Sequence, residues 1–152
     1  MWTSILTIMV LTTSPDVEVV QGGWKTRGTV VHASREYGTW ILTCGHKHQN
    51  PDHTWAYRAV GDRTSAGTVV RVCPRTDLAL IVRQYSPGQQ ERPLATQGSV
   101  DGLNGRPPDG SSGGAIVDKH GRIVGIVSGY DGWFGRTVCV PRTQIERFLR
   151  SQ

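Results

Sequence analysis

The sequence predicts an all-β protein built from many short strands. It contains 19 glycines and 8 prolines in 152 residues, and both residue types interrupt regular structure and mark turns. Apolar patterns with helical spacing are almost absent, whereas short runs of β-branched and aromatic residues recur between the turn signals. At this length the chain forms one compact unit or two small barrels that share an interface.

Strands are expected where turn residues flank a run of β-branched and aromatic residues. These runs are 17–20, 28–33, 39–43, 54–60, 67–72, 77–82, 115–117, 122–127 and 137–140. Residues 85–88 are interpreted as a crossover between two halves, 93–110 has little strand character, and 128–132 ends the run before it. A C-terminal helix is expected, with a capping box at Thr143 and Glu146 and a buried face of Ile145, Phe148 and Leu149.

The loop 110–114, with the sequence Gly-Ser-Ser-Gly-Gly, indicates a serine exposed at a turn. Small residues around one serine leave its hydroxyl and the nearby amide groups free to meet a substrate. A flexible linker is the alternative, but the loop runs directly into the hairpin pattern that follows. A nucleophilic serine also needs a base and a group that orients the base.

Two residues elsewhere have the right chemistry. His46 stands where the strand 39–43 runs out into a loop, a position from which a side chain reaches across a cleft. Asp77 directly precedes five apolar residues, so its carboxylate lies close to buried surface and needs a hydrogen-bond partner. Taken alone, His46 fits an ordinary histidine as well as a catalytic one. Asp77 fits a turn residue as well as a catalytic carboxylate.

The chain order His46, Asp77, Ser112 is that of chymotrypsin-type hydrolases among Ser-His-Asp enzymes. The segments 40–46, 77–81, 110–114 and 125–128 resemble the four sequence boxes of trypsin-like serine peptidases. The chain is more similar to the compact bacterial and glutamyl-endopeptidase-like branches than to the digestive enzymes, over about residues 26–150.

This resemblance implies two antiparallel β-barrels with the cleft between them, and a short C-terminal helix. Barrel one would span about 15–84 and barrel two about 90–152. The second barrel would be shortened, because the segment 94–110 is shorter than the corresponding segment of most trypsin-like relatives. Ser112 would attack a peptide carbonyl, His46 would carry the proton, and Asp77 would orient the imidazole. The backbone N–H groups of Gly110 and Ser112 would form the oxyanion hole, and no cofactor or metal is needed.

The resemblance also implies where a polypeptide substrate binds. Ser128, Gly129 and Tyr130 would pair with the substrate backbone as an added strand. Arg106, six residues before Ser112, would lie at the base of the pocket for the residue before the cleaved bond, and its charge would favour an acidic side chain. Ser111 stands where digestive members have an aspartate that binds a new N-terminus, so that kind of zymogen activation is not expected.

Two other functions stay open from the sequence. The fold could persist as a non-catalytic peptide-binding module whose pocket the short 94–110 segment has spoiled. A metal site could form from Cys44, His46, His48 and His53, although their spacing matches no standard zinc pattern.

Charge and cysteine content limit which classes of partner and which disulfides are expected. The formal net charge of +5 comes from arginines spread along the chain without a basic run, which favours a solvated surface over nucleic-acid binding. Three cysteines, at 44, 73 and 139, cannot all pair within the chain and are expected to be buried thiols, with one disulfide left open. The sequence leaves the oligomeric state open.

Residues 1–14 form a candidate signal segment ahead of a single domain at 15–152. Their apolar run, 5–11, is too short to span a bilayer, and it has neither a preceding lysine or arginine nor a clear cleavage site. A first barrel strand and an internal start codon are the alternatives. Secretion is therefore favoured only if this segment acts as a signal peptide.

Overall fold

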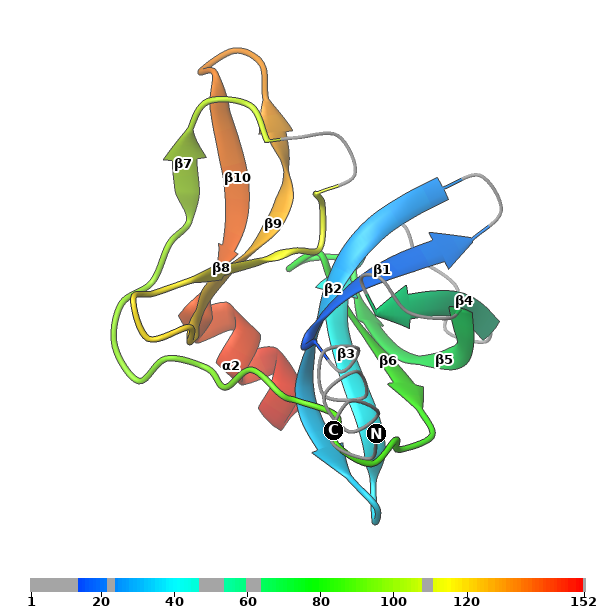
Figure 1. The fold of residues 1–152 in the computed structure, drawn as a ribbon. Coiled ribbons are helices and arrows are strands. Elements are labelled where there is room, and N and C mark those ends of the chain that lie inside the picture. The colour runs from blue at the N-terminus through cyan, green and yellow to red at the C-terminus, as the bar shows by residue number, and fades with distance from the viewer. Residues whose placement is uncertain (1–13, 22–23, 47–53, 60–63, 108–110, 152) are drawn as a thin grey trace, which may run out of the picture.

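In the part of the chain that the structure describes, the fold consists of two antiparallel sheets and one helix (Figure 1). The computed structural model describes residues 14–21, 24–46, 54–59, 64–107 and 111–151. All of residues 1–14 except Ser14 therefore lies outside the described residues, and so do Gly110, His48 and His53. The predicted all-β class with a short C-terminal helix is confirmed.

The first sheet closes into a six-stranded barrel, in the order β1-β2-β3-β6-β5-β4. Its strands are β1 (Asp16–Gln21), β2 (Trp24–Ser34), β3 (Gly38–Cys44), β4 (Thr54–Ala59), β5 (Thr64–Cys73) and β6 (Leu78–Arg83). Side chains two positions apart on a strand share a face, so Val17 and Val19 of β1 both point inward and are almost fully buried. They pack with a ring of branched residues from the other strands: Val30, Ile41, Val69 and Ile81.

The second sheet is open and has four strands, in the order β7-β10-β9-β8. Its strands are β7 (Gly102–Asn104), β8 (Ala115–Val117), β9 (Ile123–Asp131) and β10 (Arg136–Pro141). It is a shortened form of a barrel, as the brief 94–110 segment predicts. The sequence missed β7, because three residues are too few to show alternation.

The segment between the two sheets covers part of the side on which the second barrel lacks strands. Ile123 N–H donates to the Pro93 carbonyl, Ala95 N–H donates to the Ile123 carbonyl, and Val100 N–H donates to the Val124 carbonyl, all at 2.8–2.9 Å. The linker therefore runs beside the start of β9 and satisfies backbone groups that further strands would satisfy in a full barrel.

β9 is longer than the sequence predicts. The prediction that 128–132 ends this strand is wrong, because β9 continues to Asp131 and pairs with β10 to the end. A β-bulge interrupts the pairing: Val138 faces Gly129, whereas Cys139 faces Val127, which leaves Ser128 without a partner across β10. Bulges bend a strand and redirect a side chain, and here the redirected side chain is that of Ser128.

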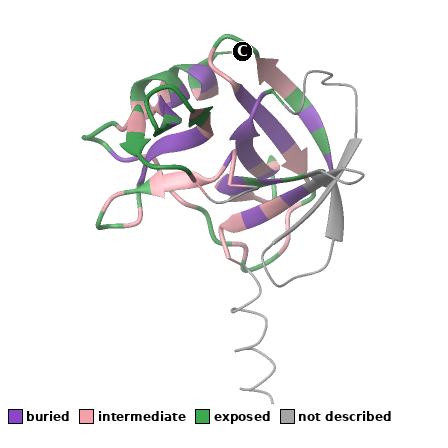
Figure 2. Ribbon diagram, turned by 90° about the horizontal axis from the view of Figure 1, so that it is seen from above, coloured by how far each residue is buried: buried purple, intermediate pink, exposed green. Residues whose placement is uncertain are grey.

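Helix α2 (Arg142–Arg150) closes the gap between the two sheets. Ile145 and Phe148 are buried and Leu149 packs beside them, as predicted. They belong to one hydrophobic core with residues of both sheets and of the linker: Leu42, Leu78 and Leu80 from the barrel, Ile123, Ile126 and Val140 from the second sheet, and Leu94 from the linker. In Figure 2 the buried residues accordingly lie on the strands in the interior, and exposed residues follow the outer turns.

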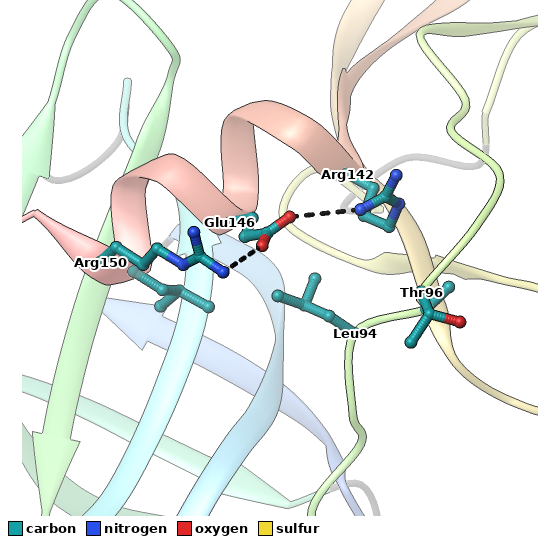
Figure 3. A pocket seen from close by; sticks show the side chains of 7 residues that line it. Leu94, Thr96, Arg142, Glu146 and Arg150 are labelled. Carbon is teal, nitrogen blue, oxygen red and sulfur yellow. Dashed lines mark hydrogen bonds and ion pairs between the residues drawn. The ribbon is translucent and has the colours of Figure 1, made fainter.

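The predicted capping box of α2 is wrong. The N-cap is Pro141, which has no side-chain donor or acceptor, and Thr143 lies inside the helix. The Arg142 N–H donates instead to the hydroxyl of Ser99, a residue from the linker (3.1 Å). Glu146 forms ion pairs with Arg142 (3.3 Å) and Arg150 (2.7 Å), and Figure 3 shows it between the two arginines beside a pocket lined by Leu94.

None of the three cysteines forms a disulfide bond. Cys44 and Cys139 are buried, as expected, and burial raises the pKa of the Cys139 thiol. Cys73 differs because it lies half-exposed at the end of β5. The hydroxyl and then the backbone amide of Thr76, next to its sulfur, lower the pKa of Cys73.

Candidate active site

His46 and Asp77 meet because their strands are neighbours in the barrel. β3 and β6 run antiparallel with Cys44 opposite Leu78, so the residues just after β3 and just before β6 lie at the same end. The Gly45 N–H donates to the Asp77 carbonyl (2.9 Å) and joins the two segments. Asp77 adopts a positive φ of 57°, a conformation that few residues other than glycine, asparagine and aspartate adopt readily.

The Asp77 carboxylate holds His46 by both its backbone and its ring. Asp77 Oδ1 accepts a hydrogen bond from the His46 backbone N–H (2.6 Å), and both carboxylate oxygens lie 2.9 Å from His46 Nδ1. Because an ionised carboxylate can only accept, Nδ1 carries the proton of the neutral ring, and Nε2 keeps its lone pair. The His46 side chain is 38% exposed and that of Asp77 only 19%. This arrangement presents a base, Nε2, on the more open side of the pair.

Ser128 is a partner of Asp77 that the sequence analysis placed elsewhere. Its hydroxyl donates to Asp77 Oδ2 from the bulge in β9, across the junction between the two sheets. The sequence prediction assigned Ser128 to substrate pairing only. This bond adds a third donor to the carboxylate and ties the second sheet to the His46–Asp77 pair.

Ser112 lies on a loop held between β2 and β9. The Arg27 N–H donates to the Ser112 carbonyl (2.8 Å), and the Gly113 N–H donates to the carbonyl of Val127 (2.7 Å), the neighbour of Ser128. The loop is thus anchored one residue away from the partner of Asp77. Within the described residues, the Ser112 hydroxyl makes no hydrogen bond with the His46 imidazole.

Comparison with known proteins identifies the fold. No protein-family model and no curated protein matches the chain. Among solved structures, a serine endoprotease from Yersinia pestis is similar with a TM-score of 0.71 and 17% identity, over 92% of this chain and 63% of that one. The chain has the chymotrypsin-type protease fold.

Two further structures share this fold. Both are crystal structures of inactive forms of the Rv3671c protease, described in one case as the M. tuberculosis protein with serine replaced by alanine. Their TM-scores are both 0.68, at 15% and 16% identity, over 93% of this chain and 88% and 90% of theirs. The present chain spans less than two thirds of the Yersinia protease, and at these identities the likeness concerns the fold alone.

Within the protease fold, a hollow of about 470 Å³ lies directly behind the serine loop. Arg106 lines it together with Ser111 and Gly114, and the Arg106 guanidinium lies 5.3 Å from the centre of the Tyr130 ring. Arg27 is a second cation in the lining, which the sequence analysis did not single out. It is recognisable only from the pairing of β2 with the loop. The other lining residues are Leu103, Asn104, Pro107, Ala115, Ile116, Val127 and Thr137.

Three predicted features cannot be placed relative to the protease fold. Gly110, predicted as an oxyanion-hole residue, lies outside the described residues, as do the candidate metal ligands His48 and His53. The oxyanion hole and the metal site therefore remain hypotheses. In the described part of the chain, no helix has the length and apolar character needed to cross a membrane.

Of the two glycines of loop 110–114 that the structure describes, Gly113 is the less able to accept a side chain. Its φ is +89°, and a Cβ there would overlap the Arg27 carbonyl oxygen and the Thr43 hydroxyl. Gly113→Ala is therefore expected to lower the free energy of unfolding by about 3 kcal/mol or more, measured by urea denaturation. Gly105→Ala is the matched control, because Gly105 has a φ of +91° with no atom within 4 Å. Equal losses in the two variants would show that the loop is not packed as described.

Proposed function

We propose that this protein is a serine endopeptidase that hydrolyses peptide bonds through His46, Asp77 and Ser112. The observation that carries the proposal is the Asp77 carboxylate, which holds His46 Nδ1 at 2.9 Å and also accepts from Ser128. A carboxylate that fixes the tautomer of a half-exposed imidazole is the orienting half of a catalytic triad. The fold shared with serine endoproteases supports the same conclusion.

The reaction follows from the protonation states of these groups. His46 Nε2 takes the proton of the Ser112 hydroxyl as its oxygen attacks the substrate carbonyl carbon, and Asp77 stabilises the imidazolium that forms. The N–H groups of Gly110 and Ser112 bind the oxyanion, an effect worth about 3 kcal/mol per donor. His46 then gives its proton to the leaving amine, and water hydrolyses the acyl-enzyme by the same steps. The mechanism uses no cofactor or metal.

A peptide-binding module without catalysis is the second candidate, and one observation favours it. The Ser112 hydroxyl and His46 are not hydrogen-bonded to each other among the described residues. Such bonds are often long in free enzymes and tighten only when substrate is bound. Labelling of the purified protein by a fluorophosphonate decides between the two functions: an activated serine reacts, and a binding module does not.

Substrate specificity forms part of the proposal. Arg106 lines the hollow behind the serine loop with Arg27, and the two guanidinium groups favour an acidic residue before the cleaved bond. Arg106→Ala is expected to lower kcat/KM for a peptide with Glu at this position by about 10- to 100-fold. The same peptide with Ala there is expected to be affected much less.

Peptide pairs that differ only at this residue measure the effect. Arg35→Ala is the control, because Arg35 is an exposed arginine in the β2–β3 turn. A wild-type preference for Arg or Lys before the cleaved bond would contradict the role of Arg106 and leave the triad proposal untouched.

A further inference from the structure

Cys73 lines a hollow that the proposed active site does not use. The hollow has a volume of about 420 Å³ and is here called the Cys73 hollow. Its lining comes from the end of β5, from the turn before β6 and from the helix and the residue after it: Arg71, Val72, Cys73, Thr76, Gln144, Arg147, Phe148 and Ser151. A half-exposed thiol therefore lies beside a hollow large enough for a small ligand.

Helix α2 forms a fixed and positively charged wall of the Cys73 hollow. The Arg71 guanidinium donates to the Phe148 carbonyl and lies 5.4 Å from the centre of the Phe148 ring, which ties β5 to α2. Two guanidinium groups line the hollow, those of Arg71 and of the exposed Arg147, and none of the described residues that line it is acidic. Arg75, in the turn, adds a third positive charge that acts on the thiol. This charge distribution favours an anionic ligand.

Thr76 supplies a hydroxyl that lacks a partner. Thr76 lines the hollow, its Oγ1 is shielded from solvent, and the described residues offer that atom no hydrogen bond of ordinary geometry. A buried hydroxyl without a partner costs stability, and a carboxylate or carbonyl of a bound ligand would accept a hydrogen bond from it. The hydroxyl also lies near the Cys73 sulfur, where it lowers the pKa of the thiol together with the backbone amides of Thr76 and Arg75. The surroundings of Cys73 therefore favour both an anionic ligand and the reactive thiolate.

The two other cysteines are poor partners for Cys73. Leu78 of β6 lies opposite Cys44 on one side and opposite Cys73 on the other. Because paired strands are about 5 Å apart, the Cα atoms of these two cysteines are about 10 Å apart, too far for a disulfide. Cys139 is buried on β10 of the other sheet, and burial raises the pKa of its thiol. A thiol that bonds to Cys73 is therefore expected to come from a separate molecule.

We propose that Cys73 is a site of reversible S-thiolation, at which the Cys73 hollow binds the disulfide of an anionic low-molecular-weight thiol such as glutathione. Glutathione fits the charge of the hollow, because its carboxylates outnumber its ammonium groups and can meet the guanidinium groups of Arg71 and Arg147. This modification goes beyond the proposed endopeptidase function and does not depend on it.

The reaction is a thiol–disulfide exchange. The Cys73 thiolate attacks one sulfur of glutathione disulfide, a bond forms between Cys73 Sγ and that sulfur, and the original S–S bond breaks. The second glutathione leaves as a thiolate, which takes up from the solvent the proton that Cys73 has lost. Cys73 is oxidised and one glutathione is reduced, so the disulfide itself is the oxidant.

The test follows S-thiolation of the full chain by intact-mass spectrometry. The reagents are glutathione disulfide and cystamine, a disulfide that carries ammonium groups and no carboxylate. Each rate is divided by the rate of N-acetylcysteine amide, a neutral thiol, with the same reagent, which removes the effect of the leaving group. We expect this relative rate to be about tenfold higher for glutathione disulfide than for cystamine. Peptide mapping is expected to place the adduct on Cys73, and dithiothreitol is expected to remove it.

Variants of α2 show whether the hollow causes this preference. Arg147→Gln is expected to reduce the preference for glutathione disulfide to about threefold, because it removes one guanidinium from the hollow. Arg150→Gln is the matched control: Arg150 is exposed on the same helix, does not line the hollow and carries the same charge. It should keep the wild-type preference. Cys73→Ser is expected to form no adduct.

Three results would overturn the inference. They are equal relative rates for the two disulfides, a first adduct on Cys44 or Cys139, and a preference in Arg147→Gln no lower than that in Arg150→Gln. Circular dichroism checks that each variant is folded. None of these measurements uses peptide hydrolysis or a reaction at Ser112, so failure of the endopeptidase proposal and failure of this inference are recognised separately.

Discussion

Replacing Ser112 by alanine is expected to lower kcat by about 10⁵-fold or more. The alanine has no hydroxyl to attack the substrate, and the proposed oxyanion hole would supply only residual catalysis. His46→Ala should cause a loss of similar size, because Ser112 and His46 act as a unit. Peptide hydrolysis under saturating substrate measures the change, and circular dichroism checks that each variant is folded.

The same prediction has a chemical readout. A fluorophosphonate is expected to attach to Ser112 and not to its neighbour Ser111, because the proposed mechanism activates only the Ser112 hydroxyl. Mass spectrometry of the labelled peptide identifies the serine, and Ser99→Ala, which changes a serine of the linker, should label like wild type. A folded protein that neither labels at Ser112 nor cleaves peptides would favour the binding module.

Asp77→Asn is expected to lower kcat by about 10⁴-fold without unfolding the protein. The amide can donate to His46 Nδ1, which places the imidazole proton on Nε2 and removes the base. Asparagine suits this position structurally, because it tolerates the positive φ of 57° found at Asp77. The substitution therefore separates the chemical role of the carboxylate from its backbone conformation.

Asp118→Asn is the matched control for this substitution. Asp118 also accepts hydrogen bonds from two backbone N–H groups, those of His120 and Arg122, but it lies in the turn between β8 and β9. Its variant should lose some thermal stability and keep its turnover. If Asp77→Asn retained turnover within tenfold of wild type, Asp77 would be a structural residue and the proposed mechanism would fail.

The sequence by itself predicted those features that depend on local pattern. Alternating β-branched residues marked the barrel strands, and the apolar face of α2 was identified from Ile145, Phe148 and Leu149. His46 and Asp77 were recognised as strand-end residues, and the four boxes of the resemblance led to the fold that the structural comparisons show. Alternation, turn chemistry and motif order are all written in short stretches of chain, so a single sequence is enough to detect them.

Only the tertiary structure decided which distant atoms meet. The bulge opposite Val138 and Cys139 turns Ser128 onto Asp77, and the hydroxyl of Ser99 caps α2 in place of Thr143. Arg27 reaches the hollow behind the serine loop because β2 pairs with that loop. Each contact joins residues far apart in the chain. Each depends on strand register and on the linker, which runs beside β9 where the second barrel lacks strands. Register is set by packing of the whole core, so these contacts cannot be predicted from the local residue pattern.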